Sequence, residues 1–144
     1  MKQLLLLLAL TGAFITKGRT QCLTHVKYYA SKMEVLDSSL TLQDTREEPF
    51  SIETRADGFG GIRENEVADS LHGVLKSVTC DWKEPFKNGK ITMVCDVHSQ
   101  DGDDMSSATI TIEAVEGKIN ITLRAKERPE RVLRLVVDKY EELK

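Results

Sequence analysis

The feature that most constrains the fold is strict alternation of apolar and polar residues near the C-terminus. The stretch "SATITIEAVEGKINITLRA", residues 107–125, alternates on both sides of Glu116 and Gly117, as expected for a half-buried antiparallel hairpin. A two-residue turn there places the apolar residues of both arms on one face, in the pairs Ala114–Ile119, Ile112–Ile121 and Ile110–Leu123. The hydrophobic register and the turn chemistry therefore agree.

A further run, "RVLRLVVDKY" at 131–140, alternates in the same way. Pairing it with the hairpin continues the apolar face through the pairs Leu123–Leu133 and Ile121–Leu135. An alternative interpretation makes 130–143 a helix with Pro129 in its first turn. The β-branched "LVV" favours a strand to about Asp138 with a short helical tail.

The stretch "NEVADSLHGVLKSV" at 65–78 has the spacing of an amphipathic helix. Asn65 is a good N-cap, and apolar residues recur at helical offsets at Val67, Leu71, Val74, Leu75 and Val78. Gly73 within it costs about 1 kcal/mol relative to alanine. We expect an α+β, β-rich fold: an antiparallel meander sheet of about five strands over 77–138, with one amphipathic helix over 65–77 packed on it and additional short N-terminal strands.

The N-terminal half is less regular. Short strands are predicted at "SLTLQD", residues 39–44, and at "PFSIETR", residues 49–55. The stretch "VKYYASKMEVL" at 26–36 fits either period, and "ADGFGGIRE" at 56–64 is typical of a glycine-rich loop.

The first residues predict export. Lys2 precedes a twelve-residue apolar run, Leu4–Ile15, which covers about 18 Å as a helix against a hydrocarbon core of roughly 30 Å. Residues 1–18 are therefore interpreted as a cleaved signal peptide with a boundary between 13 and 21, and 19–144 as a single globular domain without a transmembrane segment. Cleavage just before Cys22 would allow a lipid anchor, but the preceding "RTQ" is a poor lipoprotein processing site.

Charge and motifs exclude several classes of function. Without Lys2 and Lys17 the chain keeps 18 basic against 23 acidic residues, a net charge near −5, and it has no basic stripe for nucleic acid or anionic lipid. No ligand set predicts a metal site, no motif predicts a cofactor, and His25, His72 and His98 lie outside any catalytic motif. A surface or rim position is expected for each histidine.

The cysteines of "SVTCDWKEPFKNGKITMVCDV", residues 77–97, predict a structural disulfide. A four-residue loop at 86–89 sets Cys80 opposite Cys95 in a hairpin of strands 77–84 and 90–98, within disulfide reach, and leaves Cys22 over. The rival turn, with only Asn88 and Gly89 at its tip, leaves the two cysteines diagonal. Such a disulfide fits a secreted or periplasmic protein.

Candidate binding residues are few. They comprise the glycine-rich stretch and the hairpin tryptophan: Gly58, Phe59, Gly60, Gly61 and Trp82. The glycine spacing matches no phosphate-binding motif. Asn120-Ile121-Thr122 is an N-glycosylation sequon whose position within a strand disfavours its use.

These observations predict a binding function more than a catalytic one. We expect a small exported binding or interaction module whose partner is a protein, glycan or small ligand outside the cytoplasm. The alternatives are an extracytoplasmic enzyme, hydrolase-like in its use of carboxylates or a histidine, and an envelope-associated structural protein.

Overall fold

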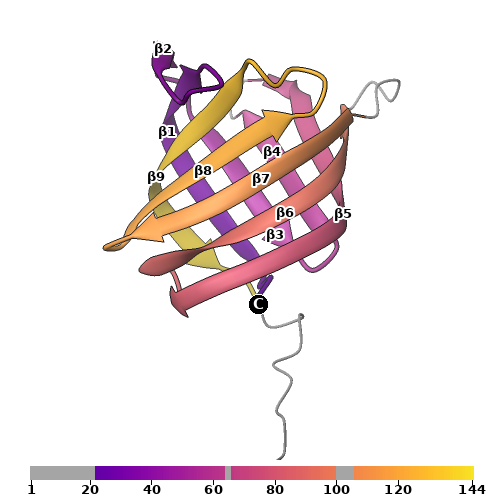
Figure 1. Cartoon of the computed structure of the whole chain (residues 1–144). Coiled ribbons are helices and arrows are strands. Elements are labelled where there is room, and N and C mark those ends of the chain that lie inside the picture. The colour runs from indigo at the N-terminus through magenta and orange to yellow at the C-terminus, as the bar shows by residue number, and fades with distance from the viewer. Residues whose placement is uncertain (1–21, 64–65, 100–105) are drawn as a thin grey trace, which may run out of the picture.

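The fold is a closed antiparallel β-barrel, described by a computed structural model for residues 22–63, 66–99 and 106–144. These residues form nine strands and no helix, so the predicted α+β class is wrong (Figure 1). The strands are β1 (Val26–Leu36), β2 (Leu42–Arg46), β3 (Phe50–Arg55), β4 (Gly58–Arg63), β5 (Glu66–Glu84), β6 (Asn88–Ser99), β7 (Ser106–Val115), β8 (Lys118–Ala125) and β9 (Val132–Glu142). The predicted signal peptide, 1–18, lies outside the described residues.

The strands follow one another around the barrel in chain order. Eight of them form the closed ring β1-β3-β4-β5-β6-β7-β8-β9, and antiparallel pairing of β1 with β9 closes it. β2 is the additional strand, paired with the part of β1 beyond its contact with β3. Closure removes the free edges that an open sheet of this size would expose.

Strands β7, β8 and β9 confirm the register expected from alternation. Ile112 faces Ile121, Ile110 faces Leu123, and Leu123 faces Leu133. Ile110, Ile112 and Ile121 are at most 1% exposed, whereas Glu113 is exposed on the outer face. The helical tail predicted after Asp138 is wrong, because β9 continues as a strand to Glu142.

The helix predicted over 65–77 is wrong, since residues 66–77 belong to the 19-residue strand β5, and residue 65 lies outside the described residues. Leu71, Gly73 and Leu75 point inward at alternate positions. Because glycine has no side chain, the two-residue apolar period of a strand cannot be recognised at Gly73. The Phe59 ring fills the space there, 2.0 Å from where a Gly73 Cβ would lie. A register shift between Leu75 and Ser77 then turns Val78 inward, which completes the helix-like spacing.

The disulfide joins Cys22 to Cys80, with 5.7 Å between their Cα atoms, and Cys95 is a buried free thiol. The predicted Cys80–Cys95 bridge is therefore wrong. The β5–β6 turn lies at residues 85–87 rather than 86–89, so Cys80 faces Ile91 and Cys95 faces Leu75. A Cys22–Cys80 bridge still fits the oxidising conditions expected outside the cytoplasm.

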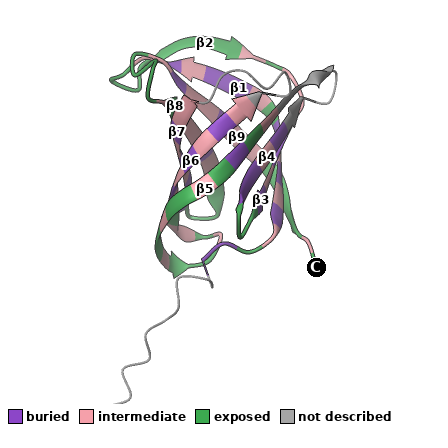
Figure 2. Ribbon diagram, turned by 90° about the vertical axis from the view of Figure 1, so that its right-hand side faces the viewer, coloured by how far each residue is buried: buried purple, intermediate pink, exposed green. Residues whose placement is uncertain are grey.

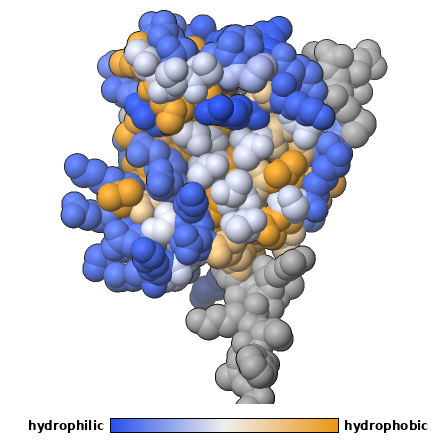
Figure 3. All heavy atoms as spheres, in the orientation of Figure 1, coloured by the Kyte–Doolittle hydropathy of each residue, from blue (hydrophilic) through white to orange (hydrophobic). Residues whose placement is uncertain are grey.

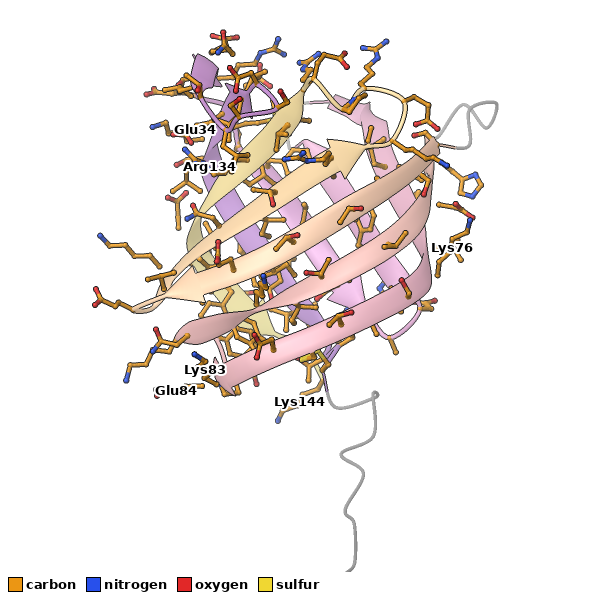
Figure 4. The ribbon with its side chains drawn as sticks, viewed as in Figure 1. Glu34, Lys76, Lys83, Glu84, Arg134 and Lys144 are labelled. Carbon is orange, nitrogen blue, oxygen red and sulfur yellow. A yellow bond between two sulfur atoms is a disulfide. The ribbon has the colours of Figure 1, made fainter. Side chains whose placement is uncertain are left out.

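An ion pair with a buried carboxylate and a half-buried arginine lies on the β1–β9 seam. Glu34 and Arg134 are directly opposed, and Arg134 Nε donates to the Glu34 carboxylate at 2.6 Å (Figure 4). Lys32 Nζ lies 3.2 Å from the same carboxylate. Burial alone would raise the pKa of Glu34, but hydrogen bonds from Arg134 and Lys32 outweigh it and hold the pKa below the usual range.

Within the described part of the chain, no helix is long and apolar enough to cross a membrane.

Candidate binding site

Around β6 and β7 the barrel interior is filled by side chains. Met93, Cys95, Ile110 and Ile112 each have 0% exposure, so no space large enough for water borders them. Eight strands enclose an interior just wide enough to be packed in this way. Burial also raises the pKa of the Cys95 thiol to about 11, which leaves it protonated and unreactive.

One end of the barrel is covered by an aromatic cluster. The Phe86 ring stacks on Tyr140 at 4.5 Å between centroids and lies 5.9 Å from Trp82, while Tyr28 lies 6.4 Å from Tyr140. Phe86 adopts a positive φ of 60° in the β5–β6 turn, and its half-buried side chain packs against the apolar core. Trp82, a predicted binding residue, is therefore a half-buried part of this cluster.

A groove lies on the outer face of the barrel over β3, β4 and β5. Figure 2 labels these three neighbouring strands. The volume of the groove is about 280 Å³. β4 forms its floor, because Gly60 at an outward position has no side chain. Lys27, Glu53 and Arg55 stand on one side of it, and His72 and Val74 on the other.

The predicted glycine-rich loop is thus a strand, and its residues are divided between two faces. Phe59 and Gly61 point inward. Gly60 points outward beneath the His72 ring, and a Cβ atom at Gly60 would lie 3.7 Å from His72 Nδ1. Phe59 and Gly60 both line the groove. Of the five predicted binding residues, Gly58, Gly61 and Trp82 are not among the residues that line this groove.

A network of charged groups occupies the β3 side of the groove. Glu53 accepts hydrogen bonds from His25 Nε2 at 2.5 Å and from Arg55 Nε at 2.9 Å. Hydrogen bonds from His25 and then Arg55 hold the pKa of Glu53 below its usual range, so the carboxylate is ionised at neutral pH. Lys27, directly opposite Glu53 on β1, adds a cation, and Asp57 a further anion.

The sheet brings the three histidines to one side of the molecule. Cross-strand register links Glu53 to Gly60, Gly60 to His72, and His72 to His98, and His25 bonds to Glu53. All three have surface or rim positions, as expected: His72 is exposed and the other two are half-buried. Sequence reasoning missed their proximity, because they are separated by more than twenty residues and meet only through strand pairing.

This arrangement lacks the parts of two common kinds of site. In the described ranges, no three or more His, Cys, Asp or Glu side chains are placed to hold a metal ion. No serine or cysteine hydroxyl or thiol among those residues hydrogen-bonds to a histidine. The groove can thus supply charge, hydrogen bonds and a flat glycine floor to a bound molecule.

Fold and groove together define a class, a closed eight-stranded antiparallel β-barrel with an additional strand and a polar groove on its outer face. Comparisons with protein-family models, with curated proteins and with solved structures found no match. What the groove does is therefore argued from its own chemistry.

Proposed function

We propose that this chain is an exported binding protein and that the groove over β3, β4 and β5 holds a small zwitterionic ligand. The observation that carries the proposal is the glycine floor at Gly60, which leaves an open space between charged groups of both signs. The side chains of Met93, Cys95, Ile110 and Ile112 are fully enclosed by the barrel, and the proposed ligand lies on its outer surface.

Size and charge support this class of ligand. A groove of about 280 Å³ lies just below the range of roughly 300–1,000 Å³ typical of sites for drug-sized molecules. Lys27 can face an acidic group of the ligand. Asp57 can face a basic group, because Glu53 is already bonded to His25 and Arg55.

The leader and the disulfide support export. Residues 1–18 have the composition of a signal peptide, and Cys22–Cys80 is a cross-link of the kind that persists in oxidising compartments. A binding protein with these features would meet its ligand in the periplasm or outside the cell.

An enzyme is the second candidate, favoured by one observation. The His25–Glu53 hydrogen bond is the base-and-orienter half of a nucleophilic site. A hydrolase would need a nucleophile beside His25, and no described serine or cysteine bonds to it. Binding therefore accounts for more of the groove than catalysis does.

The test is NMR titration of the chain with free amino acids and other small zwitterions, alongside their amide and ester derivatives. Glycine amides occupy their own region of the nitrogen dimension, so Gly60 and Gly73, which both line the groove, report directly on it. We expect saturable shifts of these amides with the zwitterion and weaker shifts with the derivative that lacks the carboxylate. No glycine shift with any member of the panel would contradict the proposal.

Gly60→Val supplies the matched variant. A Cβ at Gly60 meets only the His72 ring, at ordinary contact distance, so valine should occupy the groove and leave the strand intact. We expect ligand affinity to fall at least tenfold with little change in Tm. Thr122→Val, on β8 at the other side of the barrel, is the control and should bind as the unaltered chain does.

A further inference from the structure

We propose that Asn120 is an acceptor for an N-linked glycan and that this glycan covers the side of the barrel opposite the groove. Asn120-Ile121-Thr122 meets the acceptor pattern, whereas the other two asparagines, Asn65 and Asn88, are not followed by serine or threonine at the second position. The inference concerns a different face from the proposed ligand site and stands without it.

The geometry of β8 presents this asparagine outward. Ile119 and Ile121 on either side of it point into the core, at 4% and 1% exposure, so Asn120 and Thr122 share the outer face. The Asn120 side chain is half-exposed and has no hydrogen bond with any described residue. Asn88, by contrast, accepts a bond from the Glu116 amide.

The surroundings leave room for a bulky substituent. The cross-strand neighbours of Asn120 are Glu113, which is exposed, and Val136, which is half-buried. The β7–β8 turn at residues 116–117 is close along the chain and open, and nothing lies within 4 Å of a Cβ built on Gly117. A glycan on Asn120 could extend over this turn into solvent.

The position of the sequon within a strand does not prevent its use. The barrel closes only when β1 pairs with β9, and β9 (Val132–Glu142) follows Asn120 in the chain. While the chain enters a secretory compartment from its N-terminus, Asn120 is therefore presented before the final strand can close the sheet. Glycan transfer needs Asn120 to lie in an extended segment at that stage and on the outer face of the folded barrel afterwards.

The glycan would lie on a distinctive surface. Thr79, Thr92, Thr111 and Thr122 face one another in register across β5, β6, β7 and β8, and we call these four residues the threonine row. Figure 3 shows side chains of intermediate hydropathy over the front of the barrel, with hydrophilic groups above and to the left. In the closed ring, β8 is four strands away from β4 in either direction. A glycan on β8 would thus shield this face and leave the groove open.

The test is translation of the full chain in the presence of microsomes, followed by protease treatment and peptide-N-glycosidase. We compare the unaltered chain with Asn120→Gln, Thr122→Ala and Thr122→Ser. We expect one enzyme-sensitive mass shift in protease-protected chains of the unaltered protein and of Thr122→Ser, and none in Asn120→Gln or Thr122→Ala.

The proposal is overturned if protected chains carry no shift, if the shift persists in Asn120→Gln, or if no chain becomes protease-protected. Non-reducing electrophoresis of the same samples keeps the test independent of folding. Because both altered side chains point outward, all variants should form the Cys22–Cys80 bridge, and an unglycosylated variant that retains this bridge has lost only its acceptor. Failure here would leave the groove and its ligand unaffected.

Discussion

Strands β7, β8 and β9 and strands β3, β4 and β5 form opposite sides of one barrel from two kinds of sequence. On the first side, isoleucine and leucine fill the inward positions. On the second, glycine occupies two of the inward positions, at Gly61 and Gly73, and an outward one, at Gly60. Large inward side chains build a packed wall, whereas glycine leaves space that a neighbouring ring fills on the inside and a groove takes up on the outside.

The difference divides stability and binding between the two sides. The regular side buries apolar surface in register, which is the main source of stabilisation for such a sheet. The glycine-bearing side relies on Phe59 over Gly73 and on the Cys22–Cys80 bridge, which ties the N-terminal segment to β5. Four predictions test this division, in order of decreasing effect.

The largest effect is expected from the disulfide. Replacing both Cys22 and Cys80 by alanine should lower the free energy of unfolding by roughly 4 kcal/mol, from the loop entropy of a sequence separation of 58. Urea denaturation measures this. Cys95→Ala removes a buried thiol but no cross-link, and should cost only about 1 kcal/mol. Equal losses in the two variants would show that Cys95 takes part in the bridge.

The regular side should be sensitive to loss of inward bulk. Ile121 is 1% exposed, so Ile121→Ala should destabilise the barrel by about 2–5 kcal/mol. Thr122→Ala, one residue further on the outer face, should cost under about 0.5 kcal/mol. Thermal unfolding of both variants compares them, and similar Tm values would contradict the register of β8.

The glycine-bearing side should instead lose stability when a side chain is added. Gly73→Ala brings a Cβ to 2.0 Å from the Phe59 ring, and the ring is itself buried, so a loss of about 1–3 kcal/mol is expected. Gly60→Ala, with its nearest neighbour at 3.7 Å, should change stability by under about 0.5 kcal/mol. If chemical denaturation showed a larger loss of stability for Gly60→Ala than for Gly73→Ala, the groove would have been assigned to the wrong face of β4.

The smallest effect compares two carboxylates, one paired with Arg134 of β9 and one beside the groove. Glu34, on the β1–β9 seam, and Glu53, beside the groove, both have a pKa below the usual range. A lowered pKa contributes stability that is present above the pKa of the unfolded chain and is lost as pH falls through the folded value. Stability should therefore decline below about pH 4.3, the usual pKa of glutamate.

Single variants separate the two carboxylates. Glu34→Gln should reduce the loss of stability at acid pH more than Glu53→Gln does. The reason is that the Glu34 side chain is 8% exposed and the Glu53 side chain 24%. Urea midpoints at neutral and acid pH measure the difference. If Glu34→Gln lost as much stability at acid pH as the unaltered chain, the ion pair of Glu34 with Arg134 would contribute nothing to stability.

The sequence by itself determined the regular side of the barrel. Alternation of β-branched residues in 107–125 and 131–137 specified strand type, register and inward face at Ile110, Ile112 and Ile121, all of which the structure confirms. The physical reason is that a strand with one buried face must alternate, and a shift of one residue would expose the whole apolar set. The same reasoning identified Gly60 and its neighbours as unusual, although it assigned them to a loop.

Three features could be determined only from the tertiary structure: the strand conformation of the helix-like stretch, the pairing of the cysteines and the groove. Gly73 lacks the side chain that would mark its inward position, because the space belongs to Phe59 from another strand. Cys80 meets Cys22 rather than Cys95, since barrel closure brings the N-terminal segment to β5 and the Phe86 turn shifts the hairpin register. Lys27, Glu53 and His72 form one site because strand pairing joins distant residues, and such contacts leave no periodic trace in the sequence.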